Sequence, residues 1–198
     1  MTLTSFAHGA NGYTSDARPK SGFMLNRFYD HTANSANNQW GEITFPTFRL
    51  GEIYLNFIEA VLECKIRGVN IPANYSTKAM EIWKELRSRV NLPAITESYP
   101  HATDNEQLEL CRKERRVELA FENHRFFDTR TWKIAEECDG GKMWGMNVET
   151  TGSGDVTPDS FWKEPCLRKR VFKKQHYLYP FTQTEISLNK QLTQNYGW

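Results

Sequence analysis

The chain has 198 residues, a formal net charge of +1 at pH 7 and a hydrophobic fraction of 39%. This fraction is typical of a globular core, and no apolar run approaches the roughly 18 residues of a membrane-spanning helix, which argues against an integral membrane protein. A nearly balanced charge gives no general attraction for polyanions, so we do not expect nucleic acid as a partner. The four cysteines form no CxxC motif and HExxH does not occur, so we expect neither a metal ion nor a cofactor.

Residues 1–48 form the first of three predicted segments. They carry few helix signals and are rich in Gly, Asn, Ser and Thr, with aromatic residues scattered among them. The aromatic residues distinguish this segment from a disordered tail, and an irregular stretch of this length is unusual inside a compact domain. We therefore expect residues 1–48 to pack against other chain, and we expect the sequence to be a fragment of a larger protein.

The second segment, residues 49–138, is predicted to be helical. Apolar residues of 49–67 recur at the i, i+1, i+4, i+5 spacing of one wide helix face, and Gly68 follows as a helix end prefers. A second helix is predicted over 76–90, antiparallel to the first, so that the two form a helical hairpin. The residues expected to face inward are Ile53, Tyr54, Phe57, Ile58, Val61 and Leu62 in the first helix and Ile82, Trp83, Leu86 and Val90 in the second.

A third helix is predicted from Thr103 to about Glu122, because the Thr103 hydroxyl and Glu106 match a capping box. In a regular helix, Glu114, Glu118 and Glu122 share one face at i, i+4 and i+8. A paired-carboxylate glycosidase needs two such groups about 5–10 Å apart, and two carboxylates one turn apart meet the short end of this range, so a glycoside hydrolase is one hypothesis. Neighbouring arginines would lower a carboxylate pKa, which is unsuitable for a general acid and favours a structural charge network. The network residues, expected to be partly buried and hydrogen-bonded, are Arg115, Arg116, Glu118, Arg125 and Asp128.

Residues 139–198 form the third predicted segment, which is rich in loops. Turn residues run through 139–165, and we expect one long loop there. The stretch 176–180 alternates and is predicted to be extended, and Thr182 with Glu185 is predicted to open a short helix through a second capping box.

Trp40, Trp144 and Trp162 lie in polar loops. An exposed indole has a flat apolar face, and with nearby amides and carboxylates it suits a sugar ring, which has an apolar face and a polar rim. Packing of a loop onto its own domain explains the same tryptophans equally well. No nucleophile, metal-ligand or cofactor motif is present, so these three residues are the ligand-binding candidates and no catalytic residue is assigned.

Six segments of the chain form an ordered set. They are SGFMLNRFYD (21–30), FRLGEIYLNFIEA (48–60), LRSRVNLP (86–93), KERRVELAFENHRFFDTRTW (113–132), YLYPFTQTEISLN (177–189) and QNYGW (194–198). Together they resemble the C-terminal region of the SusD/RagB family of outer-membrane nutrient-binding lipoproteins, from about residue 21 to the last residue. Asn123 departs from the family pattern, which usually has Gly at this place.

The resemblance implies a mainly α-helical protein with a tetratricopeptide-like, SusD-type scaffold and long irregular loops, of which this chain is the C-terminal part. It implies a non-catalytic cell-surface protein of a Gram-negative bacterium, held at the outer membrane only by an N-terminal lipid that this chain lacks. The expected ligand is an oligosaccharide, and the expected partner is a SusC-like TonB-dependent transporter. Two alternatives stay open: the glycoside hydrolase, and a helical scaffold for protein interaction with no small ligand.

Overall fold

The computed structural model divides into two compact units. The helical unit is residues 30–127, and the C-terminal unit is residues 128–198 together with 1–29. The residues described are 25, 27–28, 30, 32–34, 37–42, 44–148, 162 and 166–198, with the side chains of 166 and 167 left out. Most of the predicted irregular segment 1–48 therefore lies outside the described residues.

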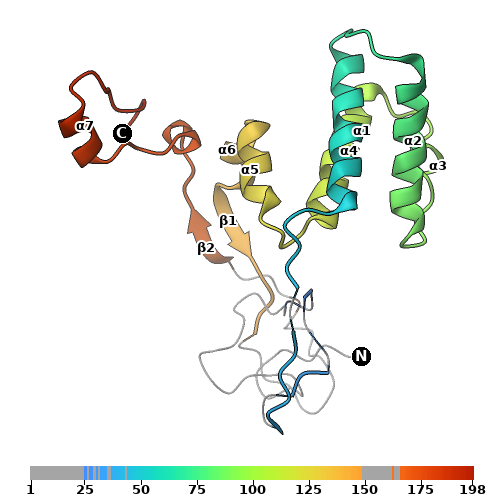
Figure 1. Ribbon diagram of the computed structural model, residues 1–198, viewed down its shortest axis with the longest axis horizontal. Helices are drawn as coiled ribbons and strands as arrows, with labels where there is room; N and C mark the ends of the chain where they lie inside the picture. Colours follow the sequence, from blue (N-terminus) through green and yellow to red (C-terminus); the bar gives the residue numbers. More distant parts are fainter. Residues whose placement is uncertain are drawn as a thin grey trace. The chain divides into compact units, whose positions relative to one another are not determined.

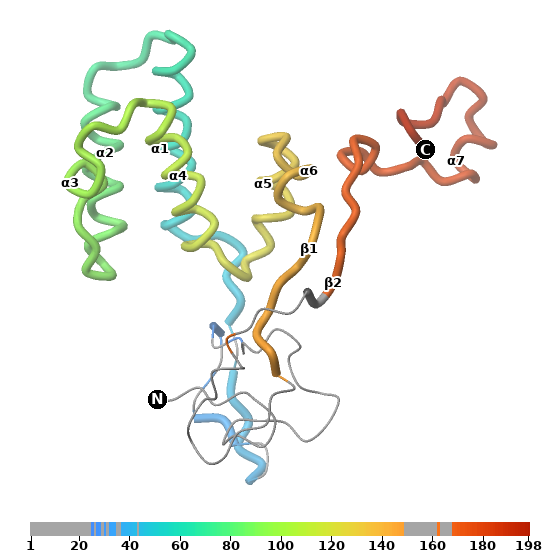
Figure 2. Tube along the Cα trace, turned by 180° about the vertical axis from the view of Figure 1, so that it is seen from behind, coloured from blue at the N-terminus to red at the C-terminus, as the bar shows by residue number. Residues whose placement is uncertain are grey.

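Four helices build the helical unit: α1 (Leu50–Ile66), α2 (Ala73–Ser88), α3 (Ile95–Ser98) and α4 (Asp104–Glu118). Helix α1 packs against both α2 and α4, and Figures 1 and 2 show α1 and α2 side by side and antiparallel. The predicted mainly α-helical class is confirmed. Among the described residues, no helix combines the length and the apolar character needed to cross a membrane.

The core of the helical unit lies between α1, α2 and α4. Leu55 of α1, Trp83 of α2 and Cys111 of α4 are completely buried there. Two predictions about this core are wrong. Ile53 is exposed, because it lies about 200° around α1 from Leu55. Val90 is exposed because α2 ends before it. The other core residues are Ile58, Val61, Leu62, Ala79, Leu86, Ile95, Leu108 and Leu119.

Helix α4 ends at Glu118, four residues before the predicted end at Glu122. Phe121 (φ 66°) and Asn123 (φ 65°) adopt left-handed backbone, which a right-handed helix cannot contain. Asn adopts this conformation more readily than most residues because its short polar side chain bonds locally, so it fills a place where glycine is usual. Helix α5 (His124–Thr131) starts directly afterwards.

The C-terminal unit contains α6 (Ala135–Cys138), β1 (Gly141–Trp144), β2 (Cys166–Arg170), the 3-10 helix η3 (Lys174–Tyr177) and α7 (Gln183–Leu188). Strands β1 and β2 pair antiparallel, with Lys142 opposite Lys169 and a bulge beside Trp144 (Figure 1). The prediction of one loop over 139–165 is wrong at β1, because so short a strand shows no alternation and its partner lies far along the chain. The prediction of an extended stretch over 176–180 is wrong in its first part, which belongs to η3.

Both predicted capping boxes are confirmed. Thr103 Oγ1 accepts a hydrogen bond from the Glu106 amide (3.4 Å), and the Glu106 carboxylate accepts one from the Thr103 amide (2.8 Å). The same reciprocal pair joins Thr182 and Glu185 at the start of α7. The backbone hydrogen bond from Thr103 is the main cause of a lowered pKa of Glu106.

Candidate functional site

The row of carboxylates predicted on α4 lies within the helical unit and is bound to its scaffold. Glu114 accepts hydrogen bonds at Oε2 from Trp83 Nε1 (3.0 Å) and from Arg87 Nη1 (2.7 Å). Both donors belong to α2, and the Trp83 ring is itself part of the core. Glu114 therefore joins α4 to α2.

Glu118 and Glu122 converge on Arg49, the residue just before α1. Arg49 donates from Nη1 to Glu118 Oε1 (2.6 Å) and from Nε to Glu122 Oε2 (2.7 Å), and Arg89 also donates to Glu118 (2.6 Å). Burial alone would lower the pKa of Arg49, but hydrogen bonds to Glu122 and Glu118 and their charges outweigh it, so that the pKa is raised. Both carboxylates are thus committed to ion pairs that tie the end of α4 and the turn after it to the start of α1, an arrangement that argues against a hydrolytic pair.

The predicted network residues lie in different environments. Arg115 is buried and donates from Nη1 to Asn56 Oδ1 on α1 (2.5 Å). Arg116 departs from the expectation, because it lies about 100° further around α4 and its side chain is exposed. Arg125 is half-buried on α5, and Asp128, in the C-terminal unit, is buried.

The arginines outside α4 that pair with these glutamates were not predicted from the sequence. Arg49 precedes Glu118 by 69 residues and Glu122 by 73 residues, and Arg87 lies on another helix from Glu114. Spacing rules connect residues three or four apart on one helix, so they do not identify pairs of this kind.

The described residues offer no obvious centre for nucleophilic or metal chemistry. Burial, together with the negative charges of Glu59 and Glu114, raises the pKa of the Cys111 thiol to about 12. The thiol therefore stays protonated at neutral pH and is a poor nucleophile. Across the part of the chain that the structure describes, no three His, Cys, Asp or Glu side chains are grouped so that they could hold a metal ion.

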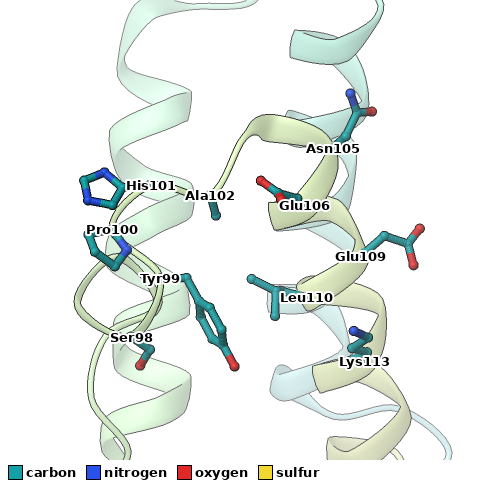
Figure 3. Close-up of a pocket in the computed structure, with 10 residues that line it drawn as sticks. All are labelled: Ser98, Tyr99, Pro100, His101, Ala102, Asn105, Glu106, Glu109, Leu110 and Lys113. Atoms are coloured by element: carbon teal, nitrogen blue, oxygen red, sulfur yellow. The ribbon is translucent and has the colours of Figure 1, made fainter.

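A pocket of about 630 Å³ lies between the segment after α3 and the first turns of α4 (Figure 3). Tyr99 and Leu110 point toward each other across it, and Glu109 and Lys113 line its side on α4. The Tyr99 side chain is half exposed. An accessible aromatic ring beside polar side chains is one arrangement that accommodates a sugar. No sequence motif marks this pocket, because Tyr99 stands in a short connection between α3 and α4.

The three candidate tryptophans are all exposed. The exposed fractions are 79% for Trp40, 53% for Trp144 and 60% for Trp162. Trp40 belongs to the helical unit and the other two belong to the C-terminal unit, and Trp144 lies on β1 rather than in a loop. Exposure is a requirement for stacking on a sugar ring, and the ligand-binding role of each residue stays a prediction.

The C-terminal unit also has a cationic surface that was not predicted. Its sequence signal is CLRKRVFKK at 166–174, which the net charge of +1 for the whole chain conceals. No acidic residue occurs between 166 and 180. The exposed side chains that define the cationic surface are Lys142, Arg168, Lys169, Arg170, Lys173 and Lys174.

The described residues form a mainly helical protein with a small two-stranded sheet, and comparison with known proteins gives its family. The SusD family matches residues 3–198. A SusD-like protein (BF3747) from Bacteroides fragilis has a solved structure with 32% sequence identity and a TM-score of 0.60, over 79% of this chain and 26% of that one. The structure of BT4246 has 27% identity and a TM-score of 0.64, over 81% of this chain and 25% of that one. Among curated proteins, no relative matches.

The chain belongs to the SusD family, because the family match covers nearly all of its residues. The resemblance carried by the six sequence segments is therefore confirmed. The chain spans about a quarter of the length of the solved structures that it matches.

Proposed function

We propose that this chain is the C-terminal part of a non-catalytic, cell-surface protein that binds oligosaccharides for uptake with a SusC-like TonB-dependent transporter. The observation that carries the proposal is the SusD family match over residues 3–198. In this proposal the whole protein is held at the outer membrane by an N-terminal lipid. Ligand contact comes from exposed aromatic side chains and hydrogen bonds, without a metal ion or a cofactor.

The geometry of the helical unit supports binding over hydrolysis. A glycosidase needs two carboxylates that face a common substrate, one of them protonated. Glu114 is held by Trp83 and Arg87, and Glu118 and Glu122 are held by Arg49. These acids are occupied in structural ion pairs and hydrogen bonds, so the glycoside hydrolase is the weaker alternative.

Exposed aromatic side chains support a small ligand over a scaffold that binds only proteins. The candidates are Trp40, Trp144, Trp162 and the half-exposed Tyr99 in its pocket. Tyr99 lies beside Glu109 and Lys113, and Trp144 lies beside Lys142. An apolar ring face beside polar groups is the combination that a sugar ring matches.

The test is a glycan screen of the full-length protein that contains this chain, followed by calorimetric titration of each glycan that binds. Trp40→Ala, Trp144→Ala, Trp162→Ala and Tyr99→Ala are compared with Val117→Ala, a control at an exposed residue without a ring. We expect at least one aromatic variant to raise the Kd about twofold to tenfold, because stacking contributes about 0.5–1.5 kcal/mol, and the control to leave it unchanged. Absence of glycan binding by the full-length protein, or release of shortened glycan products, would overturn the proposal.

A further inference from the structure

One face of the β1–β2 sheet gathers Lys142, Lys169 and Trp144. Lys142 on β1 stands directly opposite Lys169 on β2, and residues directly opposite in an antiparallel pair share a face. Trp144 follows Lys142 by two residues on the same strand and so shares that face as well. The Lys142 Nζ atom lies 5.4 Å from the centroid of the Trp144 ring. We call these three side chains the Lys–Trp face.

The two ammonium groups of the Lys–Trp face have no carboxylate partner among the described residues. Asp139, just before β1, already accepts hydrogen bonds from Thr129 Oγ1 (2.7 Å) and Arg130 Nη1 (3.5 Å). Like charges directly opposite each other destabilise an antiparallel pair, so the stability of the sheet does not explain this arrangement. An anion bound between the two ammonium groups would relieve the repulsion.

The rest of the cationic surface adds positive electrostatic potential near the Lys–Trp face. Arg168, Arg170, Lys173 and Lys174 are exposed and lie on or just after β2. Several cations in one small region attract an anionic ligand and raise its rate of association, although the whole chain is nearly neutral.

We propose that the Lys–Trp face binds an acidic polysaccharide, with Lys142 and Lys169 pairing to its carboxylate or sulfate groups and Trp144 stacking on a sugar ring. This inference rests on the proposed function and narrows its ligand class to anionic glycans. The exposed indole of Trp144 matches the flat apolar face of a sugar ring, and titration with phospholipid vesicles separates a glycan from a lipid surface.

The full-length protein is titrated calorimetrically with oligogalacturonate, alginate oligosaccharides and chondroitin sulfate. The neutral comparisons are methyl-esterified oligogalacturonate and desulfated chondroitin with its carboxylates esterified. The variants are Lys142→Gln/Lys169→Gln and Trp144→Ala. The matched control is Lys78→Gln/Lys84→Gln, which removes the same charge from two exposed lysines of α2.

We expect at least one acidic glycan to bind more tightly than its neutral counterpart, with an affinity that falls as salt rises. Lys142→Gln/Lys169→Gln should raise its Kd about tenfold, since each exposed ion pair contributes up to about 1 kcal/mol, and the α2 control should change it less than about twofold. Trp144→Ala should raise the Kd about fivefold. The lysine variants lie at exposed positions, so their effect can be interpreted even where Trp144→Ala disturbs the sheet.

The outcomes separate this inference from the proposed function. Binding of neutral glycans, without preference for any acidic one, would overturn the proposal of an acidic ligand but would be consistent with the proposed function. Binding of no glycan at all would remove both. Duplex DNA or phosphatidylglycerol vesicles could bind as tightly as the acidic glycan and lose the same affinity in Lys142→Gln/Lys169→Gln. That result would show a surface for polyanions or membranes in general and would overturn the proposal of a glycan ligand.

Discussion

The arginine–glutamate network of the helical unit and the lysines of the β1–β2 sheet in the C-terminal unit use charge in opposite ways. In the helical unit, Arg49 holds Glu118 and Glu122, so that charges join elements far apart in sequence. On the β1–β2 sheet, Lys142 and Lys169 face each other without a carboxylate partner among the described residues. A charge that joins elements contributes to folding, whereas an exposed charge without a carboxylate partner is available to a ligand. Substitutions in the first group should therefore change stability, and substitutions in the second should change binding.

The largest effect is expected at Trp83, the buried ring of α2. Trp83→Ala should destabilise the protein by about 3–5 kcal/mol, because it opens a cavity and leaves the Glu114 carboxylate without one of its donors. Urea unfolding measures the loss. Trp40→Ala, the same change at an exposed ring, should stay within about 0.5 kcal/mol, and equal losses for the two would contradict the assigned core.

Arg49→Met should have the next largest effect. It leaves Glu118 and Glu122 without their shared cation, and the Glu122 side chain is only 3% exposed. We expect a loss of about 2 kcal/mol in urea unfolding, below the value for a fully buried pair because Arg49 is partly exposed.

The control for Arg49 is Arg67→Met, which removes an exposed i,i+4 pair with Glu63 and should cost at most about 0.5 kcal/mol. Adding Glu122→Gln to Arg49→Met should cost less than the sum of the single changes, because the two residues share one interaction. Simple additivity would show that the pair contributes nothing.

Thr103→Ala should cost about 1 kcal/mol, because it removes the side-chain cap of α4. The capping carboxylate adds a pH dependence. Since the fold lowers the pKa of Glu106, its contribution is complete above the ordinary carboxyl pKa and is lost as the pH falls through the lowered value. Unfolding measured from neutral to acidic pH should show this loss in the parent and less of it in Glu106→Gln.

The smallest effect, and one of opposite sign, is expected in the C-terminal unit. Lys169→Gln removes the repulsion with Lys142 and should stabilise the β1–β2 pairing by about 0.2–0.5 kcal/mol. Slower hydrogen exchange of the strand amides measures this gain. Faster exchange would mean that Lys169 supports the sheet, which would contradict the contrast between the two units.

Local patterns in the sequence predicted the helices but did not predict the tertiary contacts. The apolar periodicity of α1 and the capping boxes at Thr103 and Thr182 rest on residues a few positions apart, so they could be found in a single chain. Because the apolar face of α1 is wide, the sequence did not show which of its residues point into the core. Ile53 was predicted to face inward, but it is exposed.

The candidate site shows the same division. The exposure of Trp144 could be anticipated from its polar surroundings, but its position on a strand beside Lys142 depends on pairing with β2. The Arg49 ion pairs likewise depend on packing of α4 against α1. Contacts of this kind are set by the fold and have no fixed spacing in the sequence.

The burial of Trp83 also makes the protein a source of two separable optical signals. Its indole is shielded from water and hydrogen-bonded to Glu114, so it should emit at shorter wavelength than the water-exposed indoles of Trp40 and Trp144. The blue edge of the emission should follow the helical core during unfolding. Quenching by iodide should instead report the surface indoles, and a glycan that covers Trp144 should reduce the quenching without moving the blue edge.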